Sequence, residues 1–145
     1  GQKCSAASRA YIPRRLWPSL KEKLIAEIQS IRQGDVSDFS NFMGAVIDRK
    51  AFDSISSYIQ AVRASSEAKI LQGGGCRSEE GYFIEPTVIV TTDPEFKTMK
   101  EEIFGPVLTV YVYPAGEYKK YVSLNAGFSN PLVSCTRRPT RQPTP

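Results

Sequence analysis

The stretch Val107-Leu-Thr-Val-Tyr-Val-Tyr113 decides the fold class of this 145-residue chain. Its residues are β-branched, aliphatic or aromatic, and none of them is charged. A strand that is apolar on both faces is typical of the interior of a sheet with helices on both sides. We therefore predict a central strand over residues 107–113.

Two stretches upstream of this strand repeat apolar residues at spacings of three and four, the period of an amphipathic helix. Pro18 fits the first turn of the first helix, and Gly34 fits its end. Asp48 can cap the second helix by accepting a bond from a free backbone N–H. The two stripes are Trp17, Leu20, Leu24, Ile28 and Ile31 in the first helix and Phe52, Ile55, Ile59 and Val62 in the second.

Shorter strands are predicted over residues 9–13, 68–71 and 82–91. Pro86 lies within the last of these and indicates an edge strand or a bulge, because proline has no N–H to donate. Strands that alternate with helices favour a layered α/β fold. The glycines at 73–75 are predicted to form a loop between two strands.

The pattern fails after Tyr121. Four of the ten prolines fall in the last fifteen residues, and no period persists there. Residues 123–145 also carry +3 of the net charge of +4 and contain no acid. We expect residues 1–121 to fold and residues 122–145 to form a divergent, disordered tail.

Composition excludes several classes of function. Histidine is absent, which excludes Ser-His-Asp and Cys-His catalysis and histidine metal sites within this chain. The three cysteines form no C-x-x-C pair, so we predict no metal site and no disulfide framework. No apolar run is long enough to cross a bilayer, which takes about 20 residues. The nearly neutral folded part argues against a nucleic-acid-binding face.

Two segments carry candidate chemistry. Cys4 precedes small residues at a possible helix start, where the helix dipole and the neighbouring Lys3 can lower a thiol pKa. Residues 100–106, Lys-Glu-Glu-Ile-Phe-Gly-Pro, place an acid pair and an aromatic ring at the entrance of the best strand. Ligand binding and a simple capped turn remain open for this second segment. The acids Glu79 and Glu80 are predicted to be solvated, and the glycines at 73–75 lack the spacing of a phosphate loop.

Together these segments resemble the aldehyde dehydrogenase superfamily. Residues 1–4 are similar to its G-Q-x-C nucleophile motif, and residues 101–106 to its E-E-I-F-G-P motif. Three further segments match in order: Gly34-Asp35, with Val36 where the family has proline; residues 44–47, with Ala45 where it has proline; and residues 81–87. The alternative interpretation, an unrelated small α/β binding module, would require that all five matches to the family arose by coincidence.

Within the superfamily the chain most resembles the mitochondrial Δ1-pyrroline-5-carboxylate dehydrogenases, on residues 2–6, 16–18 and 110–114. This resemblance implies part of an aldehyde dehydrogenase catalytic domain. It also implies NAD as cofactor, a small aldehyde as substrate, and oxidation of L-glutamate γ-semialdehyde to L-glutamate in proline catabolism. A mitochondrial matrix location, and a homo-oligomer for the full-length parent, follow in the same way. From the composition we expect no nucleic-acid or membrane partner.

The resemblance assigns roles to single residues. Cys4 would be the nucleophile, and its backbone N–H would help to hold the oxyanion. Ser5 would line the substrate pocket. Glu102 would accept hydrogen bonds from the nicotinamide ribose, and Phe104 would pack near the nicotinamide. Glu101 would face solvent or cap the turn.

The same resemblance implies that much of the enzyme is not in this sequence. The dinucleotide-binding domain, the base that activates water, the oxyanion asparagine, the loop that grips the substrate carboxylate and the oligomerisation strand have no counterpart here. The chain begins at Gly1, so we expect a removed leader or a piece of a longer protein. The alternative is a catalytically inactive truncated product that acts as a subunit-docking module.

Overall fold

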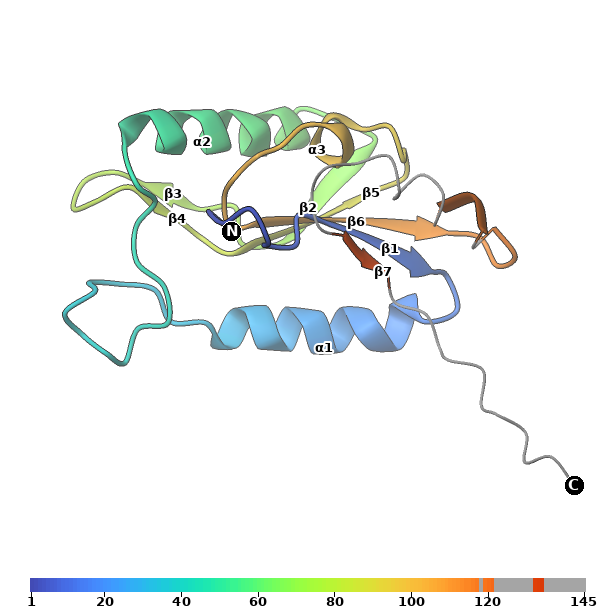
Figure 1. Cartoon of the computed structure of the whole chain (residues 1–145), viewed down its shortest axis with the longest axis horizontal. Coiled ribbons are helices and arrows are strands. Elements are labelled where there is room, and N and C mark those ends of the chain that lie inside the picture. The colour runs from blue at the N-terminus through green and yellow to red at the C-terminus, as the bar shows by residue number, and fades with distance from the viewer. Residues whose placement is uncertain (118, 122–131, 135–145) are drawn as a thin grey trace, which may run out of the picture.

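The computed structural model of the chain describes residues 1–117, 119–121 and 132–134. Helices lie on both faces of one main sheet (Figure 1), so the predicted layered α/β fold is confirmed. In chain order the elements are β1 (Arg9–Pro13), α1 (Trp17–Ser30), α2 (Arg49–Arg63), β2 (Ala68–Gln72), β3 (Cys76–Arg77), β4 (Phe83–Ile84), β5 (Thr87–Thr91), α3 (Lys97–Lys100), β6 (Val107–Tyr113) and β7 (Leu132–Ser134).

Strand β6 lies in the middle of the main sheet, whose order is β2-β5-β6-β1-β7. It is parallel to β5 on one side and to β1 on the other, so both of its edges are paired. Its alternate residues pack on the two faces of the sheet. Val110 packs with residues of β1 and β5 beneath α1, whereas Val107 packs with residues of α2. The predicted central strand is therefore confirmed.

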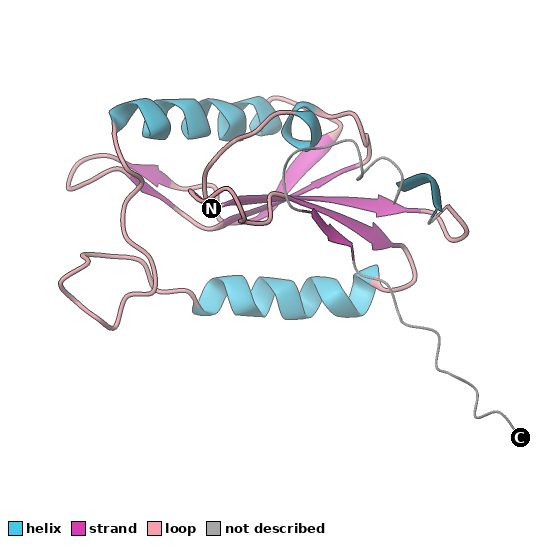
Figure 2. Cartoon of the chain, in the orientation of Figure 1, coloured by secondary structure: helices cyan, strands magenta, loops and turns pink. Residues whose placement is uncertain are grey.

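Helix α2 covers the other face of the sheet from α1 (Figure 2). The Asp48 carboxylate accepts a bond from Ala51 N–H at 2.7 Å, which confirms the predicted cap. The predicted apolar stripe is buried along the whole helix because it faces the sheet. The stripe consists of Phe52, Ile55, Ile59 and Val62.

Helix α1 packs its predicted stripe less deeply, since none of its residues is fully buried. It ends at Ser30, and the next residue, Ile31, is already extended. Gly34 therefore does not end the helix, as the sequence suggested. Instead, the backbone N–H of Gly34 donates to Met43 O at 3.0 Å and closes the loop that follows.

The predicted strand over residues 82–91 is broken in two at Pro86. Strand β4 pairs with β3 in a separate two-stranded sheet, and β5 joins the main sheet between β2 and β6. The expected edge strand is therefore wrong. Proline lacks the N–H that a ladder needs, and Thr87 N–H makes the first bond to the β6 side, to Pro106 O at 2.8 Å. The pairing of β2 with β5 contains a shift of register, and this shift lies in β2, between Ile70 and Gln72.

Most of the predicted tail, residues 122–131 and 135–145, lies outside the described residues. Within residues 122–145 the structure describes only β7, which pairs in parallel with β1. At these three residues the backbone forms a strand along the edge of β1 that does not face β6. None of the described helices has the length and apolar character that a membrane span requires.

The buried stripe of α2 yields a stability prediction. Ile59 is 0% exposed, and we expect Ile59→Ala to lower the free energy of unfolding by about 3 kcal/mol through lost burial and a residual cavity. The control Gln60→Ala, exposed on the same helix, should change it by less than about 0.5 kcal/mol. Urea titrations followed by circular dichroism would measure both. Equal losses in the two variants would contradict this packing.

Candidate active site

The residues that precede β1 and those that precede β6 lie side by side at one end of the sheet. The two strands are parallel, with Arg9 opposite Thr109, so the chain enters both from the same end. Thr109 donates its backbone N–H to Ser8 O at 3.0 Å. A Cβ at Gly1 would collide with the carbonyl of Gly105. The two backbones therefore touch, and position 1 accommodates only glycine in this arrangement.

Cys4 lies in an exposed turn at this end of the sheet. The turn is closed by Ala6 N–H, which donates to Lys3 O at 3.0 Å, and the next element is β1. The predicted helix start is wrong, because pairing of β1 with β6 draws the chain into extended backbone by Arg9. No helix dipole from this segment therefore acts on the Cys4 thiol.

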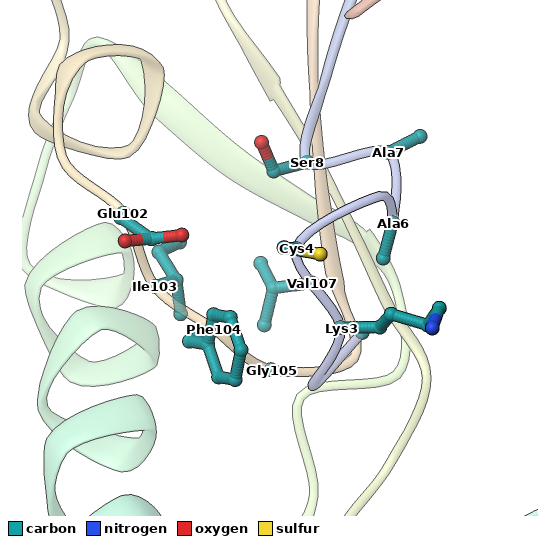
Figure 3. Close-up of a pocket in the computed structure, with 11 residues that line it drawn as sticks. Lys3, Cys4, Ala6, Ala7, Ser8, Glu102, Ile103, Phe104, Gly105 and Val107 are labelled. Atoms are coloured by element: carbon teal, nitrogen blue, oxygen red, sulfur yellow. The ribbon is translucent and has the colours of Figure 1, made fainter. Parts of the chain in front are cut away.

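Cys4, Glu102 and Phe104 line one small hollow (Figure 3). In that view the Cys4 sulfur lies on the side of Ala6, and the Glu102 carboxylate lies on the opposite side. Ser5 is exposed in the turn and is not among the residues that line the hollow. The structure thus brings together three of the four predicted site residues.

Residues 102–104 also line a second, wider groove of about 590 Å³. The other wall of this groove is the start of α2, reached through Ile47 and Asp48. Gln2 links the N-terminal segment to this wall, because its Oε1 accepts a bond from Ile47 N–H at 2.9 Å. Glu102 itself is exposed, so its carboxylate is free to accept hydrogen bonds from a ligand.

Phe104 has a backbone φ of 55°, and no other non-glycine residue in the described ranges has a positive φ. This left-handed conformation strains an aromatic residue by roughly 1–3 kcal/mol. The next residue packs closely on α2, because a Cβ at Gly105 would come within 2.6 Å of the Ile55 side chain. Phe104 is 44% exposed and lines the hollow, and such strain often marks a functional position.

Glu101 has a different environment from Glu102. Its carboxylate accepts the Tyr58 hydroxyl at 2.6 Å and lies 3.9 Å from Lys97 Nζ. This bond raises the pKa of Tyr58 to about 12, because the carboxylate stabilises the protonated hydroxyl. Glu101 is exposed and is the C-cap residue of α3, which confirms its expected position.

Gln2 and Arg9 are the residues of this region that sequence reasoning missed. Arg9 is 2% exposed and donates from Nη2 to the carbonyls of Lys100 and Glu101 at 3.3 and 3.4 Å. A basic residue at the start of an apolar strand was the one signal for Arg9. Nothing local indicated that Gln2 would bond 45 residues away.

The glycines at 73–75 form a loop between β2 and β3, as predicted. Gly74 N–H donates to Thr87 Oγ1 and Gly75 N–H to Glu85 Oε2, each at 2.9 Å. These amides are therefore engaged within the chain and do not form a phosphate cradle. Elsewhere in the described residues, no group of three histidine, cysteine or acidic side chains is arranged to hold a metal ion.

Comparison with known proteins fits this geometry. The model of the aldehyde dehydrogenase family matches residues 1–119. The chain belongs to this family. Relatives among the aldehyde dehydrogenases include the mitochondrial delta-1-pyrroline-5-carboxylate dehydrogenases of Danio rerio, 54% identical over 125 residues, and Dictyostelium discoideum, 50% identical over 124 residues. Each alignment covers 86% of this chain and 22% of the relative.

Solved aldehyde dehydrogenases share the arrangement of this chain. The delta-pyrroline-5-carboxylate dehydrogenase of Mycobacterium tuberculosis bound with NAD is 34% identical, with a TM-score of 0.78, over 92% of this chain and 25% of that one. A betaine aldehyde dehydrogenase double mutant from Staphylococcus aureus, with NAD+ bound and one cysteine modified by BME, is 33% identical, with a TM-score of 0.72, over 79% and 24%. The chain thus spans about a fifth of the length of the curated relatives it matches.

The Tyr58–Glu101 bond yields a prediction about pH. In the folded chain Tyr58 should titrate near pH 12, compared with an ordinary value of 10.0. Because the raised pKa favours the protonated folded form, this contribution to stability is complete below pH 10 and is lost as the pH rises through 12.

Titration of ¹³Cζ-labelled tyrosine by NMR would measure the Tyr58 pKa. Glu101→Gln removes the charge and should return the pKa of Tyr58 towards 10, whereas Glu79→Gln should not. A Tyr58 pKa that is the same in all three proteins would contradict the bond.

Proposed function

We propose that this segment supplies the nucleophile and part of the NAD site of an enzyme that oxidises an aldehyde to a carboxylate. The observation that carries the proposal is the shared hollow of Cys4, Glu102 and Phe104. Their backbones are brought together by strand pairing across about a hundred residues. Membership of the aldehyde dehydrogenase family supports the same reaction.

Cys4 is proposed to act as the nucleophile. Its thiol loses a proton, and the sulfur forms a bond to the aldehyde carbon as the carbonyl π bond breaks, which gives a thiohemiacetal. The backbone N–H of Cys4 helps to hold the oxygen on which negative charge develops. Loss of hydride from that carbon leaves a thioester, and water cleaves it to the carboxylic acid and the free thiol.

NAD, when bound, supplies the acceptor for this hydride. The residues of the hollow fit such a cofactor, because an exposed carboxylate can accept both hydroxyls of a ribose. Glu102 supplies that carboxylate, and the exposed ring of Phe104 supplies a flat apolar surface. The base that activates water is not assigned to any residue of this chain.

The proposed substrate is L-glutamate γ-semialdehyde, with L-glutamate as the product, in the mitochondrial matrix. The names of the relatives support the substrate and the compartment. Ser5 is proposed to approach the substrate beside Cys4 once the rest of the enzyme forms the pocket. The homo-oligomer and the assignment of residues 1–121 to one catalytic domain stay predictions.

A second candidate function is docking on a full-length subunit without catalysis. Four large apolar side chains on the connection between α1 and α2 favour it, because each is at least 79% exposed. These side chains are Val36, Phe39, Phe42 and Ile47. Co-elution of the chain with the full-length Danio rerio relative, lost in Phe39→Ser and kept in Ser40→Ala, would support docking. Separate elution of the chain and the relative would exclude it.

The proposed chemistry yields a prediction about activity. The 145-residue chain alone should give no NADH with glutamate semialdehyde and NAD, because it spans only 22% of its relatives. A chimaera in which residues 1–119 replace the matching segment of the Danio rerio relative should give NADH.

In the chimaera, Cys4→Ala should lower kcat by more than about 10⁴-fold, as expected when a nucleophile is removed. Cys76→Ala, at the other free cysteine among the described residues, should leave kcat within about twofold. NADH absorbance would measure each rate. Full activity of the Cys4→Ala chimaera would overturn the proposed nucleophile.

The role of Glu102 yields a separate prediction in the same chimaera. Glu102→Gln should raise KM for NAD by about tenfold, because a neutral amide accepts hydroxyl bonds more weakly than a carboxylate. KM for the aldehyde should stay within about twofold. Glu101→Gln is the matched control and should change neither constant. Equal effects of the two substitutions on KM for NAD would refute the assignment.

A further inference from the structure

Arg9 places a guanidinium inside the protein at the start of β1. The residue is 2% exposed, and an arginine side chain stays charged at all accessible pH values. A buried charge is tolerated when hydrogen bonds replace its lost water. Nη2 of Arg9 donates to Lys100 O at 3.3 Å and to Glu101 O at 3.4 Å.

These two carbonyls lie where α3 ends. The helix has four residues, and Glu101 is its C-cap. Carbonyls at a helix C-terminus lack partners within the helix and carry partial negative charge, so they attract a cation. Glu101 N–H donates back to Lys97 O at 2.9 Å. The guanidinium therefore holds the last turn of α3 at the point where the chain leaves it for Glu102.

The backbone of Arg9 is fixed at the same time to the other side of the site. It lies opposite Thr109 in the parallel ladder, and Ser8 O accepts Thr109 N–H. Cys4 is only five residues upstream of Arg9. Arg9 is thus paired with β6 through its backbone and is hydrogen-bonded through its side chain to the segment before Glu102.

We propose that Arg9 is a positioning residue that sets the place of residues 101–104 relative to the Cys4 turn. The expected effect of Arg9 on catalysis rests on the proposed function. The expected effect of Arg9 on structure rests on its geometry alone. Arg9 touches neither substrate nor cofactor in this assignment. Its loss should shift the Glu102 carboxylate and so weaken NAD binding more than aldehyde binding.

Arg9→Lys is the informative variant. Lysine keeps the charge, but its Nζ ends one bond short of the position of Nη2, the atom that donates to both carbonyls, and it lacks the planar guanidinium. Arg63→Lys is the matched control, because Arg63 Nη2 also donates to a loop carbonyl, Gly74 O at 2.9 Å. The control bond lies between α2 and the loop after β2, away from the hollow.

Amide hydrogen exchange of the 145-residue chain, followed by NMR, tests the structural part without any enzyme assay. Arg9→Lys should speed exchange at Glu101 N–H by about tenfold, the expected result of losing a charge-assisted bond that holds the turn. Exchange at Ala51 N–H should not change. Arg63→Lys should leave Glu101 unchanged. Unaltered exchange at Glu101 in Arg9→Lys would overturn the inference.

The chimaera tests the catalytic part. Arg9→Lys should raise KM for NAD by about tenfold while KM for the aldehyde and the rate of Cys4 alkylation stay within about twofold. A purely structural role would change both KM values and the alkylation rate together, or would change none of them. Either result would overturn the positioning role. An unsubstituted chimaera without NADH production would instead refute the proposed function, and the exchange result would still decide the structural part.

If Arg9→Lys does not fold, the unsubstituted chain still provides a test. In ¹⁵N-arginine spectra, Arg9 should show slow rotation about Cζ–Nε, with separate Nη signals, because its Nη2 is fixed by carbonyls. Arg49, whose side chain is 59% exposed, should show averaged signals. Averaged signals for Arg9 as well would overturn the inference.

Discussion

The parallel pairing of β1 with β6 is the constraint on which the rest of the structure depends. It joins residues about a hundred positions apart, from Arg9 opposite Thr109 to Pro13 opposite Tyr113. Parallel strands are entered from the same end of a sheet. The turn that carries Cys4 and the segment that carries Glu102 therefore meet without any direct side-chain bond between them. The hollow follows from topology, and the glycine at position 1 allows the close contact of the two backbones.

The features that depend on local pattern were predictable from sequence. The central strand over 107–113 is uniformly apolar, and α2 combines a regular stripe with a capping aspartate, so local preference and burial agree. The strand over residues 82–91 was mispredicted because β propensity continues across Pro86, while the ladder partner changes there. The prediction of a helix start at Cys4 was wrong for a related reason. Pairing with a distant strand overrides the local helix preference of the small residues.

At the site, the sequence indicated Cys4, Glu102 and Phe104 through motifs, but it could not indicate their supports. Gln2 and Arg9 act over 45 and 91 residues respectively, and such bonds have no signature in spacing. The positive φ of Phe104 was equally hidden, because aromatic residues rarely adopt it. The half-buried stripe of α1 and the exposed phenylalanines after it agree with a chain that spans about a fifth of its relatives.

The separation of β1 and β6 in sequence also governs how this part of the protein is made. A ribosome adds about 5–20 residues per second, so β1 waits roughly 5–20 s after its own synthesis before β6 exists. During that interval the edge of β1 that will pair with β6 has no partner, and the apolar residues of β1 are not yet packed in a sheet. Nascent chains in this state are the ones that chaperones bind. The contact that brings the two motifs together thus forms only after about a hundred further residues have been added.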